Sequence, residues 1–398
     1  MTPLLLREIE ELREQALCTI SPIKPPDSNA QLGTLFWQAQ RTKAGRNLPH
    51  YYLVYFLLVD LLRFRNFGKS EKIAWSIPID FEGTTYLLDH RKFGVGVFCE
   101  NPDAHENQAK RIVLLISKGV KVADPFFRSL ADDAVRQSRV NVKNNSSSLF
   151  QRYECLRDKF RETWAQAKAR KGEVETNTTT EQVSGILSPI KAVAYRFPAF
   201  RLTQEARWIG MAAIDAFFAW TEHVFIHLAI IQGRVVTGDE VAGLIGAEWQ
   251  EKYKKALDIT DKDSKRFYDS LGMFRRQIRN YMAHGSFGKQ GEAFKFHSGA
   301  GAVPVMLDEV RGVRRFSLTQ EIEFEEEIAL STIEEFIAHL WSGPRQPAWT
   351  YIQNADLPLI LTFASDGTYK DAMQTVEHME RFAHGLTMQL DNAANMDW

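Results

Sequence analysis

Cysteine is scarce in this sequence of 398 residues: only Cys18, Cys99 and Cys155 occur, and no two of them form a C-x-x-C pair. Zinc ribbons, dithiol redox motifs and disulfide scaffolds are therefore excluded, and this usage is typical of a reducing cytoplasm. A charge excess of one sign is also lacking, because 49 basic residues face 50 acidic ones. Any nucleic-acid binding must come from a local patch rather than from the charge of the whole chain.

Long hydrophobic runs are absent as well. The most apolar stretch is YYLVYFLLVDLL at 51–62, which is shorter than the about 20 residues that span a bilayer, and Asp60 interrupts it. The first residues, MTPLLLREIEELREQ, lack the basic leader and apolar core of a signal peptide. We therefore expect a cytoplasmic protein with no membrane partner, in which residues 51–62 form a buried helix.

Motifs for cofactors and for common hydrolases are missing too. The glycines of GVGVF and GSFGKQG fit neither G-x-x-x-x-G-K-S/T nor a strand–G-x-G-x-x-G–helix unit, and neither G-x-S-x-G nor H-E-x-x-H occurs. His223 and His227 have the spacing of two metal ligands on one helix face, but no carboxylate or cysteine completes a site, so core or interface histidines are favoured. We expect no cofactor and no metal.

The first 140 residues are predicted to form an α+β domain. Short β-rich runs separated by Gly83 and Lys92 indicate a small antiparallel meander, with strands over 73–81, 84–90 and 93–99. Apolar residues at helical spacing predict helices over 3–18, 29–43, 49–65, 107–119 and 125–138. In the segment RFRNFGK, at 63–69, aromatic and basic residues alternate; this pattern suits base stacking, but a helix end turning into a loop gives the same composition and is favoured.

The remainder of the chain is predicted to be mainly helical. Residues 141–188 are interpreted as a linker that carries a charged helix over 149–172 and a polar loop over 172–185. Residues 189–398 are predicted as a helical domain with a C-terminal extension, short strands at 293–297 and 314–318, an extended piece at 357–363, and helices over 202–231, 238–256, 262–284, 320–341 and 369–391. The fold class is thus mainly α with a smaller α+β part.

The motif that carries chemistry lies at the end of the predicted 262–284 helix, in LGMFRRQIRNYMAHGSFG. Arg279 and His284 form an R-x4-H arrangement that occurs by chance about once in a chain of this length. Two further residues make the motif more specific than its spacing alone. Asn280 directly follows the arginine, and Gly285 favours the left-handed backbone that ends a helix. MERFAHG at 379–385 echoes the motif, but Arg381 and His384 are only three apart; we interpret it as a coincidental helix end.

RNYMAHG resembles the R-x4-6-H signature of HEPN-domain ribonucleases, in which a polar residue, often asparagine, commonly follows the arginine. The resemblance covers roughly residues 190–345. A HEPN domain is a helical bundle in which a long helix with an acidic or polar residue packs beside the motif helix. The 202–231 helix, with Glu222, stands in the expected order, although the loop after the motif is longer than in a minimal member. The resemblance implies a metal-independent endoribonuclease that acts on RNA, tRNA included, as a toxin or anti-phage effector with a possible antitoxin or regulatory partner.

The residue types suit such chemistry. RNA cleavage by the ribose 2′-OH needs a base, an acid and positive charge on the transition state. His284 titrates near neutrality, Arg279 offers a planar fork of donors for phosphate, and Asn280 orients the phosphate or the histidine. Arg275 and Arg276 are either RNA-phosphate contacts or a solvated basic face. Glu222 is either an interior partner of Arg279 or His284 or a surface glutamate.

Helix geometry predicts how these groups assemble. Arg276, Asn280 and His284 share one face of an ideal helix, whereas Arg279 lies more than about 100° round from His284. Because HEPN members resolve this by dimerising, the resemblance implies a homodimer, or an arrangement of two HEPN domains, built on the motif helix. Two rival hypotheses stay open: a catalytically silent HEPN-like scaffold that binds RNA, a nucleotide or a protein, and a helical regulatory protein with no nucleic-acid role.

Overall fold

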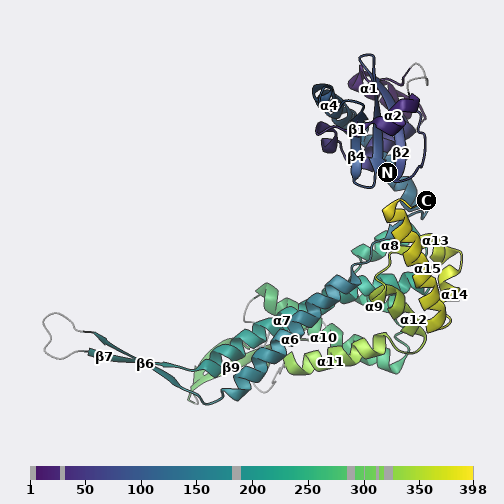
Figure 1. The fold of residues 1–398 in the computed structure, drawn as a ribbon. Helices are drawn as coiled ribbons and strands as arrows, with labels where there is room; N and C mark the ends of the chain where they lie inside the picture. Colours follow the sequence, from purple (N-terminus) through teal and green to yellow (C-terminus); the bar gives the residue numbers. More distant parts are fainter. Residues whose placement is uncertain are drawn as a thin grey trace. The chain divides into compact units, whose positions relative to one another are not determined.

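The structure, a computed structural model, describes residues 6–26, 32–181, 190–284, 292–299, 301–310, 313–317 and 326–397 (Figure 1). The chain divides into two compact units. The first comprises residues 1–140 with 237–239 and 384–398, and the second comprises 141–236 and 240–383. The fold is mainly α with a smaller α+β part, as the sequence predicts.

A four-stranded antiparallel sheet, in the order β1–β4–β3–β2, forms the centre of the first unit. The predicted meander is confirmed as β2 (Ile73–Phe81), β3 (Thr84–Arg91) and β4 (Gly94–Cys99). The two-residue turn between β2 and β3 uses Glu82 and Gly83, both at positive φ, which matches the twist of the two strands. β1 (Gln40–Arg41) adds a short strand beside β4.

Hydrogen bonds from outside the meander cover the outer sides of β2 and β4. On the outer side of β2, the backbone of Asp80 exchanges hydrogen bonds with Lys24, and Ser76 accepts one from the Phe67 N–H. Pro78 lies between Ser76 and Asp80, and its backbone faces the same outer side of β2. Proline has no N–H, so this position cannot donate a hydrogen bond to a further strand. On the outer side of β4, beside β1, the Thr42 N–H and the Arg41 guanidinium donate to the carbonyl groups of Val97 and Val95.

Helices pack on this sheet and enclose an apolar core. They are α1 (Leu6–Ile20), α2 (Leu32–Gln38), α3 (Tyr51–Tyr55), α4 (Glu106–Val122) and α5 (Asp124–Arg136). α3 continues as the π-helical stretch η3 (Phe56–Leu61), in which Leu57, Leu58 and Leu61 are fully buried. The apolar run at 51–62 is therefore a core element. Gly119 of α4 permits the close approach of α1, because a Cβ there would lie 2.6 Å from Ile20 Cγ2.

The second unit is built on two long helices that lie side by side, α6 (Ser146–Ala169) and α7 (Pro198–Ile231) (Figure 1). α6 is the charged helix of the predicted linker, and it packs within the second unit. By length and composition α7 is able to cross a membrane. However, 78% of its apolar window is buried inside the fold, as in the core helix of a soluble protein.

Shorter helices complete this bundle: α9 (Trp249–Ala256), α10 (Lys262–His284) and α11 (Glu326–Leu340). Their core is aromatic, and the rings of Phe217, Phe225, Tyr253 and Phe267 all pack around Phe336. Trp249 is also fully buried, and its indole N–H donates to Thr221 on α7.

Several predicted boundaries are wrong. The polar stretch 172–185, predicted as a loop, contributes β6 (Glu175–Glu181), which pairs with β7 (Ile190–Arg196) in a two-stranded ribbon (Figure 1). The predicted 238–256 helix is two helices, α8 (Gly238–Gly246) and α9. The predicted 369–391 helix is also two, α14 (Thr368–Ala372) and α15 (Val376–Asn395), and α15 runs on through His384 instead of ending there.

Strands β8 (Glu292–Ser298) and β10 (Val313–Ser317) match the predicted strands, and β9 (Gly301–Val310) pairs with both. The extended piece at 357–363 contains β11 (Leu359–Ile360), which pairs with β5 (Asn141–Val142), and then α13 (Leu361–Ser365). Short helical turns fill the preceding segment as η5 (Gly343–Arg345), α12 (Gln346–Trp349) and η6 (Thr350–Asn354).

Candidate active site

Helix α10 is held by one apolar face. Phe267, Leu271, Phe274 and Ile278 recur at three- and four-residue spacing and are all at least nine-tenths buried. This face packs against α7, α9 and α11. Because the apolar residues fix the rotation of the helix, they also fix where its polar residues lie.

The last turns of α10 carry the motif. The backbone of Arg279, Asn280 and His284 is helical, and α10 covers Lys262–His284, the range that the sequence predicts. The side chains of these three residues, and Gly285, lie outside the described part of the structure. The predicted pairing of motifs from two protomers therefore stays a prediction.

Glu222 joins three helices. From α7, its Oε1 accepts a hydrogen bond of 2.6 Å from Arg275 Nη2 on α10. Its Oε2 accepts one of 2.9 Å from Lys252 Nζ on α9. The Lys252 side chain is only 5% exposed and that of Glu222 is 33% exposed. Glu222 is therefore a half-buried partner of two cations, one of which is four residues before the motif arginine, and its predicted contact with Arg279 or His284 lies outside the described side chains.

The network has an electrostatic reason. A lysine ammonium removed from water needs a hydrogen-bonded counter-charge, since an uncompensated buried charge is strongly destabilising. Glu222 supplies that charge to Lys252 and shares it with Arg275. Glu248, on the other side of Arg275, is 3.8 Å away and 73% exposed, so it contributes much less. Glu222 thus anchors α10 against α7 and α9 just before the motif.

Arg275 and Arg276, predicted together as RNA-phosphate contacts, have different surroundings. Arg275 is committed to Glu222, and its side chain is 26% exposed. Arg276 is exposed, and its side chain forms no hydrogen bond or ion pair with the residues that the structure describes. Arg276 is accordingly the better placed of the two to meet an external phosphate.

His223 and His227 are bonded to the main chain. The N–H of Asn145 donates to His223 Nε2 over 2.9 Å, and His227 Nε2 lies 3.2 Å from the carbonyl oxygen of Lys143. Burial and the neighbouring His227 lower the pKa of His223 to about 3. Among the described residues no third histidine, cysteine or carboxylate joins them as a metal-binding group. His227 is 1% exposed, so this pair packs inside the second unit.

The aromatic and basic residues at 63–69 belong to the packing of the first unit. Phe64 is 4% exposed, and the ring of Phe67 packs edge-on against Phe36 at 5.0 Å. Arg65 lies over the ring of Phe67, 4.7 Å from its centroid. The two phenylalanines are thus already occupied within the protein and offer no open stacking surface.

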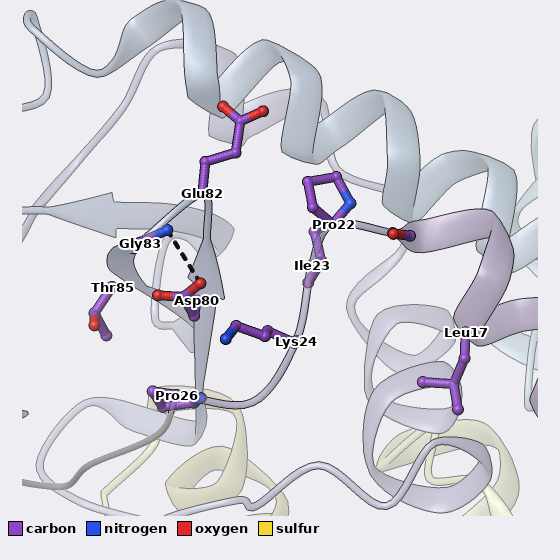
Figure 2. A pocket seen from close by; sticks show the side chains of 10 residues that line it. Leu17, Pro22, Ile23, Lys24, Pro26, Asp80, Glu82, Gly83 and Thr85 are labelled. Atoms are coloured by element: carbon purple, nitrogen blue, oxygen red, sulfur yellow. Dashed lines mark hydrogen bonds between the residues drawn. The ribbon is translucent and has the colours of Figure 1, made fainter.

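A pocket in the first unit lies between the loop after α1 and the β2–β3 turn (Figure 2). Its volume is about 620 Å³. Its carboxylates already have partners, because Asp80 accepts a hydrogen bond of 3.2 Å from the Gly83 N–H and Glu82 pairs with Arg111. The arrangement does not resemble a pair of carboxylates left available for acid–base chemistry.

The start of α7 presents a surface that the sequence interpretation missed. Phe200, Arg201, Arg207 and Trp208, which we call the arginine–aromatic face, fall within ~120° of one another around the helix. Phe200 is 66% exposed and Trp208 is 62% exposed. Neither arginine forms an ion pair with a described residue. The sequence does contain a signal for this surface, because arginines and aromatic residues alternate in YRFPAFRLTQEARW. This segment starts before the predicted 202–231 helix.

No model of a known protein family, no curated protein and no solved structure matches the chain. The evidence for function therefore consists of the motif, the helix that carries it and the surfaces around it.

Proposed function

We propose that this protein is a cytoplasmic, metal-independent endoribonuclease of the HEPN type that cleaves RNA, such as tRNA, as a toxin or anti-phage effector. The observation that carries the proposal is the sequence R-N-Y-M-A-H in the last turns of α10 (Lys262–His284), a helix packed into an α-helical bundle. The Glu222–Arg275 hydrogen bond, which fixes α10 just before the motif, supports it.

The proposed reaction follows from the residue types. A base removes the proton of a ribose 2′-OH as that oxygen attacks the adjacent phosphorus. An acid protonates the 5′-oxygen as the P–O5′ bond breaks, leaving a 2′,3′-cyclic phosphate and a free 5′-OH. His284 supplies proton transfer, Arg279 stabilises the charge on the phosphorane-like transition state, and Asn280 orients the phosphate or the histidine.

Binding of the substrate is supported by the arginine–aromatic face. Exposed aromatic rings stack unpaired bases, and unpaired arginines neutralise backbone phosphate, which together favour single-stranded RNA. Arg276 adds a further exposed cation near the motif. Local surfaces of this kind are what a chain with a net charge of −1 needs for RNA binding.

The deciding experiment is incubation of the purified protein with total RNA in EDTA, followed by analysis of the product ends. We expect cleavage that leaves cyclic phosphates and that disappears in Arg279→Ala and in His284→Ala. Arg381→Ala and His384→Ala are matched controls from the motif-like sequence in α15, and both should cleave normally. Cleavage that needs added metal, or that survives both motif substitutions, contradicts the proposal.

The alternative function is a catalytically silent HEPN-like scaffold that binds RNA, a nucleotide or a protein partner. The arginine–aromatic face favours RNA among these, because it does not depend on the motif. In that case the wild-type protein and the double motif variant bind RNA equally, and neither cleaves it.

A further inference from the structure

A second pocket, with a volume of about 700 Å³, lies in the second unit. It is formed where the end of α7, the η5 turn, α14 and the loop before α10 come together. Three segments distant in the sequence each contribute one cation to its wall: Arg234, Arg345 and Lys370. The size is within the range of pockets that bind small ligands.

These three cations have no carboxylate partner within ion-pair distance among the residues that the structure describes. The one acidic residue in the wall, Asp258, accepts hydrogen bonds from the N–H and hydroxyl of Thr260. The lining therefore carries an excess of positive charge. Burial lowers the pKa of Arg345, and the neighbouring Tyr253, Asp261 and Arg234 modify it in opposite directions.

Main-chain oxygens hold the two arginines in place. Arg234 Nη1 donates to the carbonyl of Lys255 over 3.1 Å. Arg345 Nε donates to the carbonyl of Leu340 over 2.9 Å, and its Nη2 donates to that of His339 over 2.6 Å. Carbonyl groups orient a guanidinium without neutralising it, so the remaining N–H donors are fixed and still charged. Such pre-organisation strengthens the binding of an anion.

We infer that this pocket binds a phosphorylated small molecule of about nucleotide size. Guanidinium groups are suited to phosphate oxygens, and Lys370 adds a mobile charge. Ile231, Pro344 and Met373 provide an apolar wall for the rest of the ligand. No phosphate-binding glycine motif is needed, because the donors in this pocket are side chains. The inference does not depend on the proposed ribonuclease activity.

The test is isothermal titration of the full-length protein at near-physiological salt with AMP, inorganic phosphate and adenosine. We expect AMP to bind, phosphate to bind more weakly and adenosine, which lacks the phosphate, not to bind. Lys370→Gln should weaken AMP binding about tenfold, and Lys370→Arg should keep most of it. Lys118→Gln, which removes an exposed lysine from the first unit, should leave binding unchanged.

Lys370 is chosen because its side chain is exposed and has no hydrogen bond or ion pair with a described residue, so its replacement should not disturb folding. Arg345→Lys is the second variant, and the thermal unfolding midpoint is measured beside it, since Arg345 bonds to the end of α11. Equal binding of AMP and adenosine overturns the inference. So does AMP binding that is insensitive to Lys370→Gln, and so does binding of RNA but not of AMP or phosphate.

Discussion

The carboxylate of Glu222 accepts a hydrogen bond of 2.6 Å from Arg275, which ties the C-terminal third of α7 to α10 four residues before Arg279. The same carboxylate receives the ammonium of Lys252, which is almost fully buried. Packing and the candidate chemistry are therefore linked. The hydrogen bonds of Glu222 hold α10 against α7 and α9, and they also fix the position of the helical turn that precedes the motif.

Glu222→Gln should destabilise the protein, because Lys252 keeps a neutral partner in place of a charged one. The expected loss is ~2 kcal/mol in the free energy of unfolding, measured by urea denaturation. Glu248→Gln is the matched control, since Glu248 is 73% exposed and lies 3.8 Å from Arg275. Equal effects of the two substitutions would show that burial of Lys252 does not matter.

The neighbours Arg275 and Arg276 should behave differently. Arg275→Gln should lower stability by ~1–2 kcal/mol through the lost bond to Glu222. Arg276→Gln should leave stability within ~0.5 kcal/mol and weaken RNA binding, more so at low salt. Urea denaturation and filter binding on both variants check this. A loss of stability in Arg276→Gln with none in Arg275→Gln contradicts both roles.

The arginine–aromatic face should bind single-stranded RNA. With His284→Ala as background, so that substrate is not consumed, Phe200→Ala and Trp208→Ala should each weaken binding of a single-stranded oligonucleotide about tenfold. Phe93→Ala, which removes an 87% exposed ring from the first unit, is the control. Unchanged affinity with a lower dimer fraction would instead assign this face to a protein contact.

Acidification should destabilise the protein through His223. Its folded pKa, about 3, lies below the unfolded value of about 6.5, so the neutral imidazole stabilises the fold. As pH falls from 6.5 toward 3, the unfolded state takes up the proton first, and stability declines by ~1 kcal/mol per pH unit. His223→Gln keeps an acceptor for Asn145 but cannot titrate. Its unfolding free energy should fall less steeply over this window than that of the wild type.

Subunit complementation tests whether the motif works across a dimer. If each active site combines Arg279 of one protomer with His284 of the other, a mixed dimer of Arg279→Ala and His284→Ala contains one intact site. Equal mixing should then restore about a quarter of wild-type cleavage, because half the dimers are mixed and each has one site of two. Absence of any recovery, with subunit exchange verified, means that each site uses residues of one chain.

Much of the fold could be predicted from apolar spacing. The strands 73–81 and 84–90 and the 262–284 helix have clear period-two or helical patterns, and the structure agrees with them. The sequence does not predict the β6–β7 ribbon, because threonines such as Thr178 give two opposite indications. Their branched side chains favour strands, whereas a run of polar residues is typical of a loop. The sequence does not predict the break between α8 and α9, because the apolar residues of both helices continue the same three- and four-residue spacing.

The site was predictable only in part. Sequence spacing proposes Arg279, Asn280 and His284 as candidates, but it does not reveal that Glu222 is shared between Lys252 and Arg275, since that depends on how three helices cross. Apolar spacing along α7 likewise does not distinguish the exposed ring of Trp208 from the buried ones. Its exposure is a tertiary property that no local pattern contains.

The covered edges of the sheet in the first unit have a consequence for regulation. A partner often recruits an edge strand and forms backbone hydrogen bonds with it, a mode that tolerates many sequences. Along β2 and β4, Pro78, the Lys24 bridge and the Arg41 guanidinium remove that option. A regulator that docks along β2 or β4 would therefore recognise side chains, so its specificity should be narrow and easily changed by single surface substitutions.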